Sequence, residues 1–64
     1  MYINKVKTLR EENGKTLVEL AKLAGVSAGY LCHLEKGTRK NPSIEVMESI
    51  AAALGKTIME VFFE

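Results

Sequence analysis

The sequence has little of several features that define common classes of small protein. Its single cysteine, Cys32, excludes a disulfide within the chain, and no group of cysteines and histidines has the spacing of zinc ligands. No apolar run approaches the roughly 20 residues needed to cross a bilayer, and the first residues are not typical of a signal peptide. We therefore expect a cytoplasmic protein without membrane segments, metal, cofactor or small-molecule ligand.

An excess of charge of either sign is also missing. Nine Lys and Arg residues oppose eight Asp and Glu residues, so the formal net charge is +1. Domains that bind nucleic acid through bulk charge are strongly basic, and composition is therefore neutral on such binding. We expect residues 1–64 to form one domain, which buries only about 60% of the surface of its unfolded chain. A second subunit is expected to add stability.

Apolar residues recur at the helical period through most of the chain, which predicts an all-α fold without strands, linkers or repeats. The predicted helices cover residues 2–12, about 16–24, about 27–36, 44 to about 54, and one or two turns after 57. In the first, fourth and fifth predicted helices, the residues expected to face the core are Tyr2, Ile3, Val6, Leu9, Ile44, Met47, Ile50, Ala51, Leu54, Ile58, Val61 and Phe62.

The second and third predicted helices organise the rest. Thr16 and Glu19 have the spacing of a capping box, and Ser27 is a good N-cap after the Gly25-Val26 turn. Two helices joined by so short a turn cannot run antiparallel, and a steep crossing is the geometry of a helix-turn-helix. Nucleic acid is therefore the first partner to consider.

Two charges fall on faces that are otherwise apolar. Arg10 lies on the inner stripe of the first predicted helix, and Glu35 lies on the inner face of the third. A charge on a core-facing stripe needs a partner, so we predict an ion pair between Arg10 and Glu35 that joins the two helices. The alternative is that both charges are solvated at the edges of their stripes.

Several segments, in this order and spacing, resemble a known family. They are LREENG (9–14), LAKLAGVS (20–27), the L-x-x-L-E-x-G that ends at Gly37, and NPS with I-A-x-A-L-G (41–55). Over nearly the whole chain the sequence is similar to the lambda-repressor-like DNA-binding domains of phage repressors, Cro-type proteins and their bacterial relatives.

The resemblance implies a five-helix domain whose recognition helix, residues 27–36, lies in the major groove of DNA, while two subunits bind a palindromic operator. It implies a transcriptional regulator, most simply a repressor, encoded by a bacterium, phage or plasmid and associated with the nucleoid. The Arg10–Glu35 pair is also a feature of repressors of this family. With no effector domain after the helix-turn-helix, control is expected to come through the protein's own concentration.

Three residues depart from the family pattern. Leu17 stands where many members have a glutamine that contacts phosphate, and Ala28 and Gly29 stand where phage repressors often have glutamine or asparagine. Different side chains must therefore contact the bases.

We assign these contacts by placing Leu31 at the centre of the buried side of the recognition helix. The expected base-contacting residues are Ala28, Gly29, His33 and Lys36. Ala28 packs on a thymine methyl group, and Gly29 allows close approach of the backbone. His33 donates to guanine, and Lys36 donates to guanine or to a phosphate. The alternative for His33 is an ordinary solvated histidine.

The duplex backbone is expected to be held from both ends of this helix. The predicted phosphate contacts are Ser27, Tyr30, Thr38, Arg39, Lys40 and Asn41. Instead of contacting phosphate, Tyr30 could pack at the edge of the core. Arg39 and Lys40 could instead belong to an ordinary solvated loop. The simplest interpretation of Cys32 is a small residue tolerated near the groove. The alternative interpretation is a redox switch.

Met59 and Phe63 are left over by the predicted core near the C-terminus, and we expect them to contribute to a homodimer contact. The alternative is a frayed tail. The chain does not resemble an enzyme, because its one histidine has no nucleophile or orienting carboxylate at helical spacing. The rival function is a helical protein–protein interaction module, such as an antitoxin or co-regulator, that keeps the fold without specific DNA binding.

Overall fold

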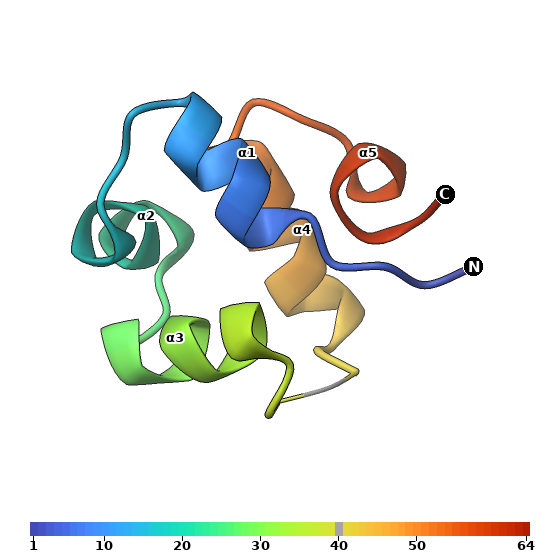
Figure 1. Ribbon diagram of the computed structural model, residues 1–64, viewed down its shortest axis with the longest axis horizontal. Helices are drawn as coiled ribbons and strands as arrows, with labels where there is room; N and C mark the ends of the chain where they lie inside the picture. The colour runs from blue at the N-terminus through green and yellow to red at the C-terminus, as the bar shows by residue number, and fades with distance from the viewer. Residues whose placement is uncertain (40) are drawn as a thin grey trace.

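The computed structural model describes residues 1–39 and 41–64, and within these residues the chain forms five helices and no strand longer than an isolated bridge. The helices are α1 (Val6–Glu12), α2 (Leu17–Ala24), α3 (Ala28–Lys36), α4 (Ile44–Ala53) and α5 (Ile58–Phe62). In Figure 1, α3 lies along one edge of the bundle and the two chain ends lie side by side at another. The predicted all-α fold is confirmed.

The caps of α2 and α3 set the geometry of this helix pair. The Thr16 hydroxyl accepts from the Glu19 N–H (3.1 Å) and the Glu19 carboxylate accepts from the Thr16 N–H (2.7 Å), which completes the predicted capping box. Gly25 ends α2 in the left-handed conformation (φ 73°), and the Ser27 hydroxyl caps α3 by accepting from the Tyr30 N–H. The chain bends by 110° between the two helices.

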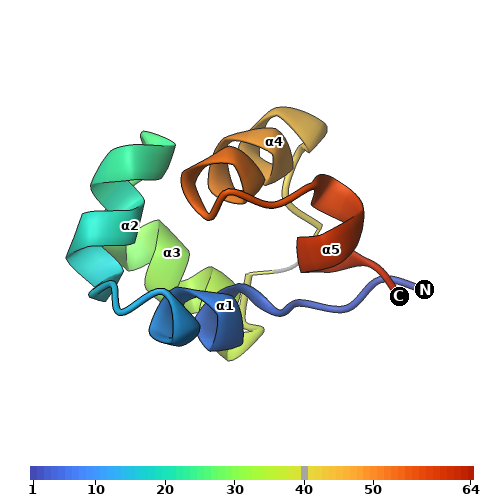
Figure 2. The ribbon, with the colours of Figure 1, turned by 90° about the horizontal axis from the view of Figure 1, so that it is seen from above.

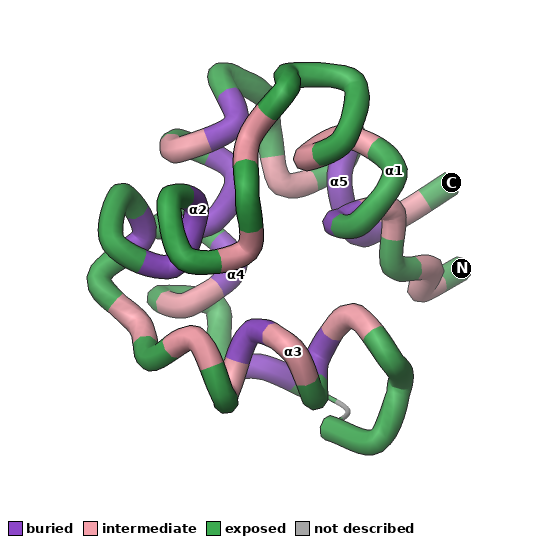
Figure 3. The backbone as a smooth tube through the Cα atoms, turned by 60° about the vertical axis from the view of Figure 1, so that its left-hand side comes forward, coloured by how far each residue is buried: buried purple, intermediate pink, exposed green. Residues whose placement is uncertain are grey.

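The core takes apolar side chains from all five helices. Figure 3 shows the buried residues in purple along the backbone. Its fully buried large members are Val6, Leu20, Leu31, Leu34, Ile50, Val61 and Phe62. No single helix of the described chain is long and apolar enough to span a membrane. Helices α2 and α3 reach that length and hydropathy only as a bent pair, and both bury apolar residues in the core.

The first helix was predicted to begin at Tyr2, and this prediction is wrong, because α1 begins at Val6. Residues 2–5 are instead extended along the end of α5 (Figure 2). The Ile3 N–H donates to the Phe62 carbonyl (2.7 Å) and the Lys5 N–H to the Val61 carbonyl (2.9 Å). The Asn4 side chain accepts from the Val6 N–H (3.0 Å), a local bond that competes with helix formation.

Two further side chains depart from their predicted positions. Ile44 was expected in the core but is 60% exposed, because it is the first residue of α4 and the side chains of this helix that contact the core begin at Val46. Phe63 was expected to point away from the core but is half-buried and packs edge-on against Tyr2, with ring centroids 5.8 Å apart. The terminal pairing brings these two rings together, which helical periodicity does not predict.

A second capping box opens α5, where the Thr57 hydroxyl accepts from the Glu60 N–H (3.2 Å) and the Glu60 carboxylate accepts from the Thr57 N–H (2.8 Å). The two capping boxes make fold stability depend on pH. The pKa values of Glu19 and Glu60 are lowered, chiefly because each carboxylate accepts a backbone hydrogen bond, from Thr16 and Thr57 respectively. A lowered folded-state pKa gives stabilisation that is complete above the unfolded value of about 4.3 and is lost as the pH falls through the folded value.

We therefore expect the melting temperature of the wild type to fall more steeply below about pH 4.5 than that of a Glu19→Gln/Glu60→Gln variant. The glutamine amides keep the capping geometry but do not titrate in this range. Thermal melts followed by circular dichroism at several pH values measure the difference. Melting temperatures that fall in parallel with pH in the two proteins would show that these two carboxylates do not contribute to the pH dependence of stability.

Candidate nucleic-acid interface

One side of α3 is buried and the opposite side is open to solvent. Leu31 and Leu34 are fully buried, whereas Gly29, His33 and Lys36 are exposed. Ala28, the fourth predicted base-contacting residue, is half-buried and packs against the core. The structure therefore gathers three of the four on an open surface of α3 and leaves Ala28 at its margin.

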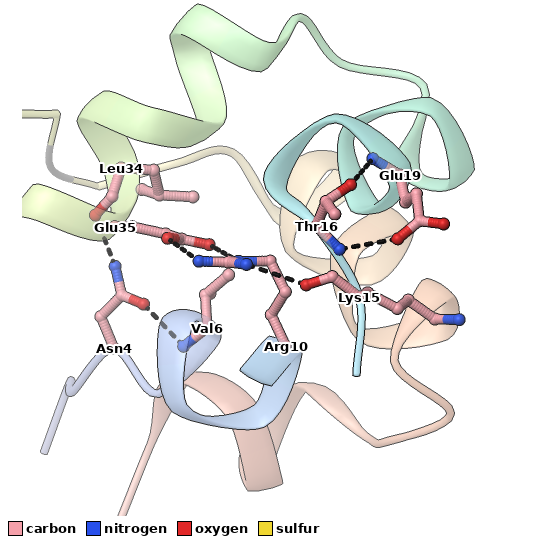
Figure 4. Close-up of polar contacts among 8 residues, drawn as sticks. All are labelled: Asn4, Val6, Arg10, Lys15, Thr16, Glu19, Leu34 and Glu35. Carbon is pink, nitrogen blue, oxygen red and sulfur yellow. Dashed lines mark hydrogen bonds and ion pairs between the residues drawn. The ribbon is translucent and has the colours of Figure 1, made fainter. Parts of the chain in front are cut away.

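An ion pair fixes the orientation of α3. The Arg10 guanidinium donates from Nε to Glu35 Oε2 (2.7 Å) and from Nη2 to Glu35 Oε1 (3.1 Å), and its Nη1 donates to the Lys15 carbonyl (2.9 Å) (Figure 4). Only 13% of the Arg10 side chain and 7% of the Glu35 side chain are exposed. The hydrogen bond to Glu35 raises the pKa of Arg10 although burial acts in the opposite direction. The pair predicted from the sequence is thus present, with two parallel hydrogen bonds.

A second polar contact to α3 comes from Asn4, which the sequence did not single out. Its side-chain N–H donates to the Leu34 carbonyl (2.8 Å) while its Oδ1 accepts from Val6, as Figure 4 shows. Asn4 lies two residues before the start of α1, and its bond to the Val6 N–H is local. Its contact with α3, 30 residues away, depends on the extended terminus.

The N-terminal end of α3 offers polar groups to a ligand. The Ser27 hydroxyl accepts the capping bond from Tyr30, and its own proton remains available for donation. The N–H groups of a first helical turn have no acceptor within the helix and favour anions. At Gly29 an added Cβ would meet no other atom within 4 Å, so the backbone is open to close approach there.

The C-terminal end of α3 carries a hydrogen-bonded cluster. Gly37 turns the chain in the left-handed conformation, and the Thr38 N–H then donates to the His33 carbonyl (3.0 Å). The Thr38 hydroxyl also donates to this carbonyl (3.1 Å) and lies 3.0 Å from Nδ1 of the His33 ring. Because both Thr38 protons are engaged, Thr38 has none to donate to a phosphate in this conformation.

Three of the predicted phosphate contacts lie together, one on α3 and two in the segment after it. Tyr30, Arg39 and Asn41 line one open groove of about 650 Å³, whose other residues are Val26, Pro42, Ser43 and Val46. The Arg39 guanidinium carbon is 5.2 Å from the centre of the Tyr30 ring, a cation–π contact that brings the charge close to α3. Lys40 lies outside the described residues.

These features define a class of protein. Two helices with a 110° bend between them, the second of which turns an exposed polar side outward, form a helix-turn-helix. Among the residues with described positions, no three His, Cys, Asp or Glu side chains are grouped to hold a metal ion.

Comparison with known proteins agrees with this geometry. A family model described as helix-turn-helix matches residues 6–61, and the chain belongs to this family. It is 39% identical over 58 residues to the HTH-type transcriptional regulator SinR of Bacillus subtilis, a match that covers 91% of this chain and 52% of SinR. It is 37% identical over 60 residues to the immunity repressor protein of Bacillus phage phi105, covering 94% of this chain and 41% of the repressor.

Solved structures of SinR have the same fold. A crystal structure of SinR in complex with DNA matches with a TM-score of 0.81 and 39% identity, over 84% of this chain and 86% of that one. A complex of SinR with the SinI protein matches with a TM-score of 0.83 and 38% identity, over 88% of this chain and 54% of that one. The present chain spans about half the length, or less, of the curated relatives it matches.

The Arg10–Glu35 pair gives a prediction for stability. Arg10→Met leaves the Glu35 carboxylate buried without its partner, and we expect a loss of about 2–3 kcal/mol in the free energy of unfolding. The double variant Arg10→Met/Glu35→Leu should recover most of that loss, since no unpaired charge remains. Urea unfolding measures both variants.

The matched control is Lys7→Met, which removes an exposed cation from the same helix and should change stability by less than about 0.5 kcal/mol. An Arg10→Met variant no less stable than this control would contradict a structural role for the pair.

Proposed function

We propose that this chain binds a palindromic DNA operator as a homodimer, with α3 in the major groove, and acts as a transcriptional repressor in the bacterial cytoplasm. The observation that carries the proposal is the exposed side of α3, held by the Arg10–Glu35 pair within a fold that matches SinR in its complex with DNA at a TM-score of 0.81. The relative from phage phi105 is itself an immunity repressor.

Base contacts are assigned to the exposed side of α3. His33 and Lys36 reach base edges, Gly29 lets the backbone approach, and Ala28 packs on a thymine methyl group at the margin. Phosphate contacts are assigned to Ser27 at the start of α3, to Tyr30 within α3, and to the segment after α3, where Arg39, Lys40 and Asn41 contribute. Thr38 is omitted from this set because its hydroxyl proton is directed to the His33 carbonyl.

The size of the molecule favours two copies on one operator. Its longest Cα extent is 27 Å, whereas successive major grooves on one face of B-DNA lie about 34 Å apart. One copy of α3 therefore fills one half-site. We assign the contact between the copies to Met59, which is 65% exposed, with Phe63 contributing from the edge of the terminal pairing.

A second function is favoured by a specific observation. Val18, Leu23, Ile44 and Met59 are large apolar side chains with more than half of their surface exposed, and the net charge is only +1. SinR itself forms a complex with the SinI protein. Exposed apolar side chains suit a protein partner, and a protein-interaction module that does not bind specific DNA is therefore the alternative.

Selection from a random duplex pool at about 150 mM salt separates the two functions. We expect enrichment of an inverted repeat with half-sites about one helical turn apart, and an affinity that falls with salt by about 0.9 log units per log unit for each neutralised phosphate. Sequencing of the bound pool and titrations at several salt concentrations measure these quantities. A pool that stays random, with weak or absent binding, would favour the interaction module.

Met59→Lys tests the dimer contact in the same assay. This variant should keep its fold, because the side chain is exposed, and should bind a single half-site as the wild type does. Its preference for the complete inverted repeat over the half-site should be reduced. An unchanged preference would remove Met59 from the proposed contact.

Gly29→Ala separates a role in binding from a role in folding. Glycine within a helix costs about 1 kcal/mol relative to alanine, and a Cβ at this position meets no atom within 4 Å, so the variant should be slightly more stable. If the α3 backbone lies against the bases, the same methyl group should weaken operator binding. A variant that is stabilised and binds the operator as tightly as the wild type would show that DNA does not approach here.

A further inference from the structure

The side chain of Thr38 connects the His33 ring to the carbonyl group of the same histidine. Its Oγ1 is 3.1 Å from the His33 carbonyl oxygen and 3.0 Å from Nδ1 of the ring. The backbone N–H groups of Thr38 (3.0 Å) and Arg39 (3.1 Å) donate to the same carbonyl and hold the turn in place. The ring of the proposed base-contacting histidine is therefore anchored at Nδ1, and Nε2 is its other polar atom.

The two contacts of the Thr38 hydroxyl favour one position for the ring proton. A threonine hydroxyl has one proton and can accept on its remaining lone pairs, whereas a carbonyl oxygen can only accept. The Thr38 hydroxyl donates that proton to the carbonyl, because two acceptor oxygens 3.1 Å apart repel each other without a proton between them. The hydroxyl then has no proton for the ring, so Nδ1 must donate to it.

We propose that Thr38 holds neutral His33 in the tautomer with the proton on Nδ1, so that Nε2 meets DNA as a hydrogen-bond acceptor. The proposal rests on the proposed function for its consequence in DNA binding, although the tautomer itself belongs to the free protein. Thr38 is in this account a positioning residue that acts through His33.

This tautomer changes the base atom that His33 can contact. In the major groove, guanine N7 and O6 and thymine O4 are acceptors, whereas the amino groups of adenine (N6) and cytosine (N4) are donors. An acceptor at Nε2 matches an amino group and does not match guanine. The donation to guanine predicted from the sequence is therefore replaced, for the neutral ring, by acceptance from adenine or cytosine.

The tautomer can be measured without DNA. His33 is the single histidine of the chain, so long-range ¹H–¹⁵N NMR of the imidazole needs no further assignment. At about pH 8.5, where an ordinary imidazole is neutral, we expect a protonated Nδ1 and an unprotonated Nε2. Thr38→Val, which removes the hydroxyl and keeps the branched shape, should move the proton toward Nε2, and Thr38→Ser should keep it on Nδ1. A wild type protonated on Nε2, or no change in Thr38→Val, would overturn the proposal.

The consequence for DNA is tested on the selected operator at the position where His33→Ala relaxes specificity. Removing the amino group there, by purine for adenine or 2-pyrimidinone for cytosine, should weaken wild-type binding about five- to fifty-fold. Where the contacted base is cytosine, replacing its paired guanine by 7-deazaguanine should have no effect. The opposite pattern would overturn the proposed contact.

Thr38→Val should weaken operator binding by about five- to fifty-fold and leave binding to random DNA unchanged. Thr38→Ser should restore the affinity for the operator. Arg39→Ala, one residue further on, is the control and should weaken operator and random DNA alike. Equal weakening of both DNAs by Thr38→Val would count against a role through His33. If no operator is selected, the proposed function fails, and the NMR result still decides the tautomer.

Discussion

The guanidinium of Arg10 is the group on which the arrangement of this fold depends. It is largely removed from water, and a buried cation is tolerated only where its donors meet acceptors. Both Glu35 oxygens and the Lys15 carbonyl supply them, so one side chain of α1 fixes the loop before α2 and the orientation of α3. Because Glu35 is turned inward for this purpose, the opposite side of α3 is left to residues that face solvent.

The paired chain ends hold α3 from a second direction. The extended segment before α1 hydrogen-bonds to the end of α5, and this placement allows Asn4 to reach the Leu34 carbonyl. Together, Asn4 and Arg10 attach two successive residues of α3, Leu34 and Glu35, to the N-terminal part of the chain. A small core of short helices thus holds a rigid helix whose outer side remains open, which suits a protein that presents one helix to a ligand.

The sequence was sufficient for those parts of the molecule that depend on neighbours within four residues. Both capping boxes, the Ser27 cap and the inward faces of α2 and α3 follow from local spacing, and all are present in the structure. The Arg10–Glu35 pair was also accessible, because two charges on apolar stripes require each other. The path of residues 2–5, the packing of Phe63 and the contact of Asn4 were not, because they depend on the two ends of the chain meeting. Similarly, the outward position of His33 follows from a helical wheel, but its bond to Thr38 depends on the turn at Gly37.

The terminal pairing also makes the chain nearly a closed ring. The amino group of Met1 lies 3.2 Å from the carbonyl oxygen of Glu64, and Figures 1 and 2 both show the ends adjacent. A short peptide could therefore join them with little distortion of the folded state. Such a cyclic chain would have fewer conformations available when unfolded, so its folded form would gain stability from the entropy of closure. This gain would come without altering α3, which lies along a different edge of the bundle.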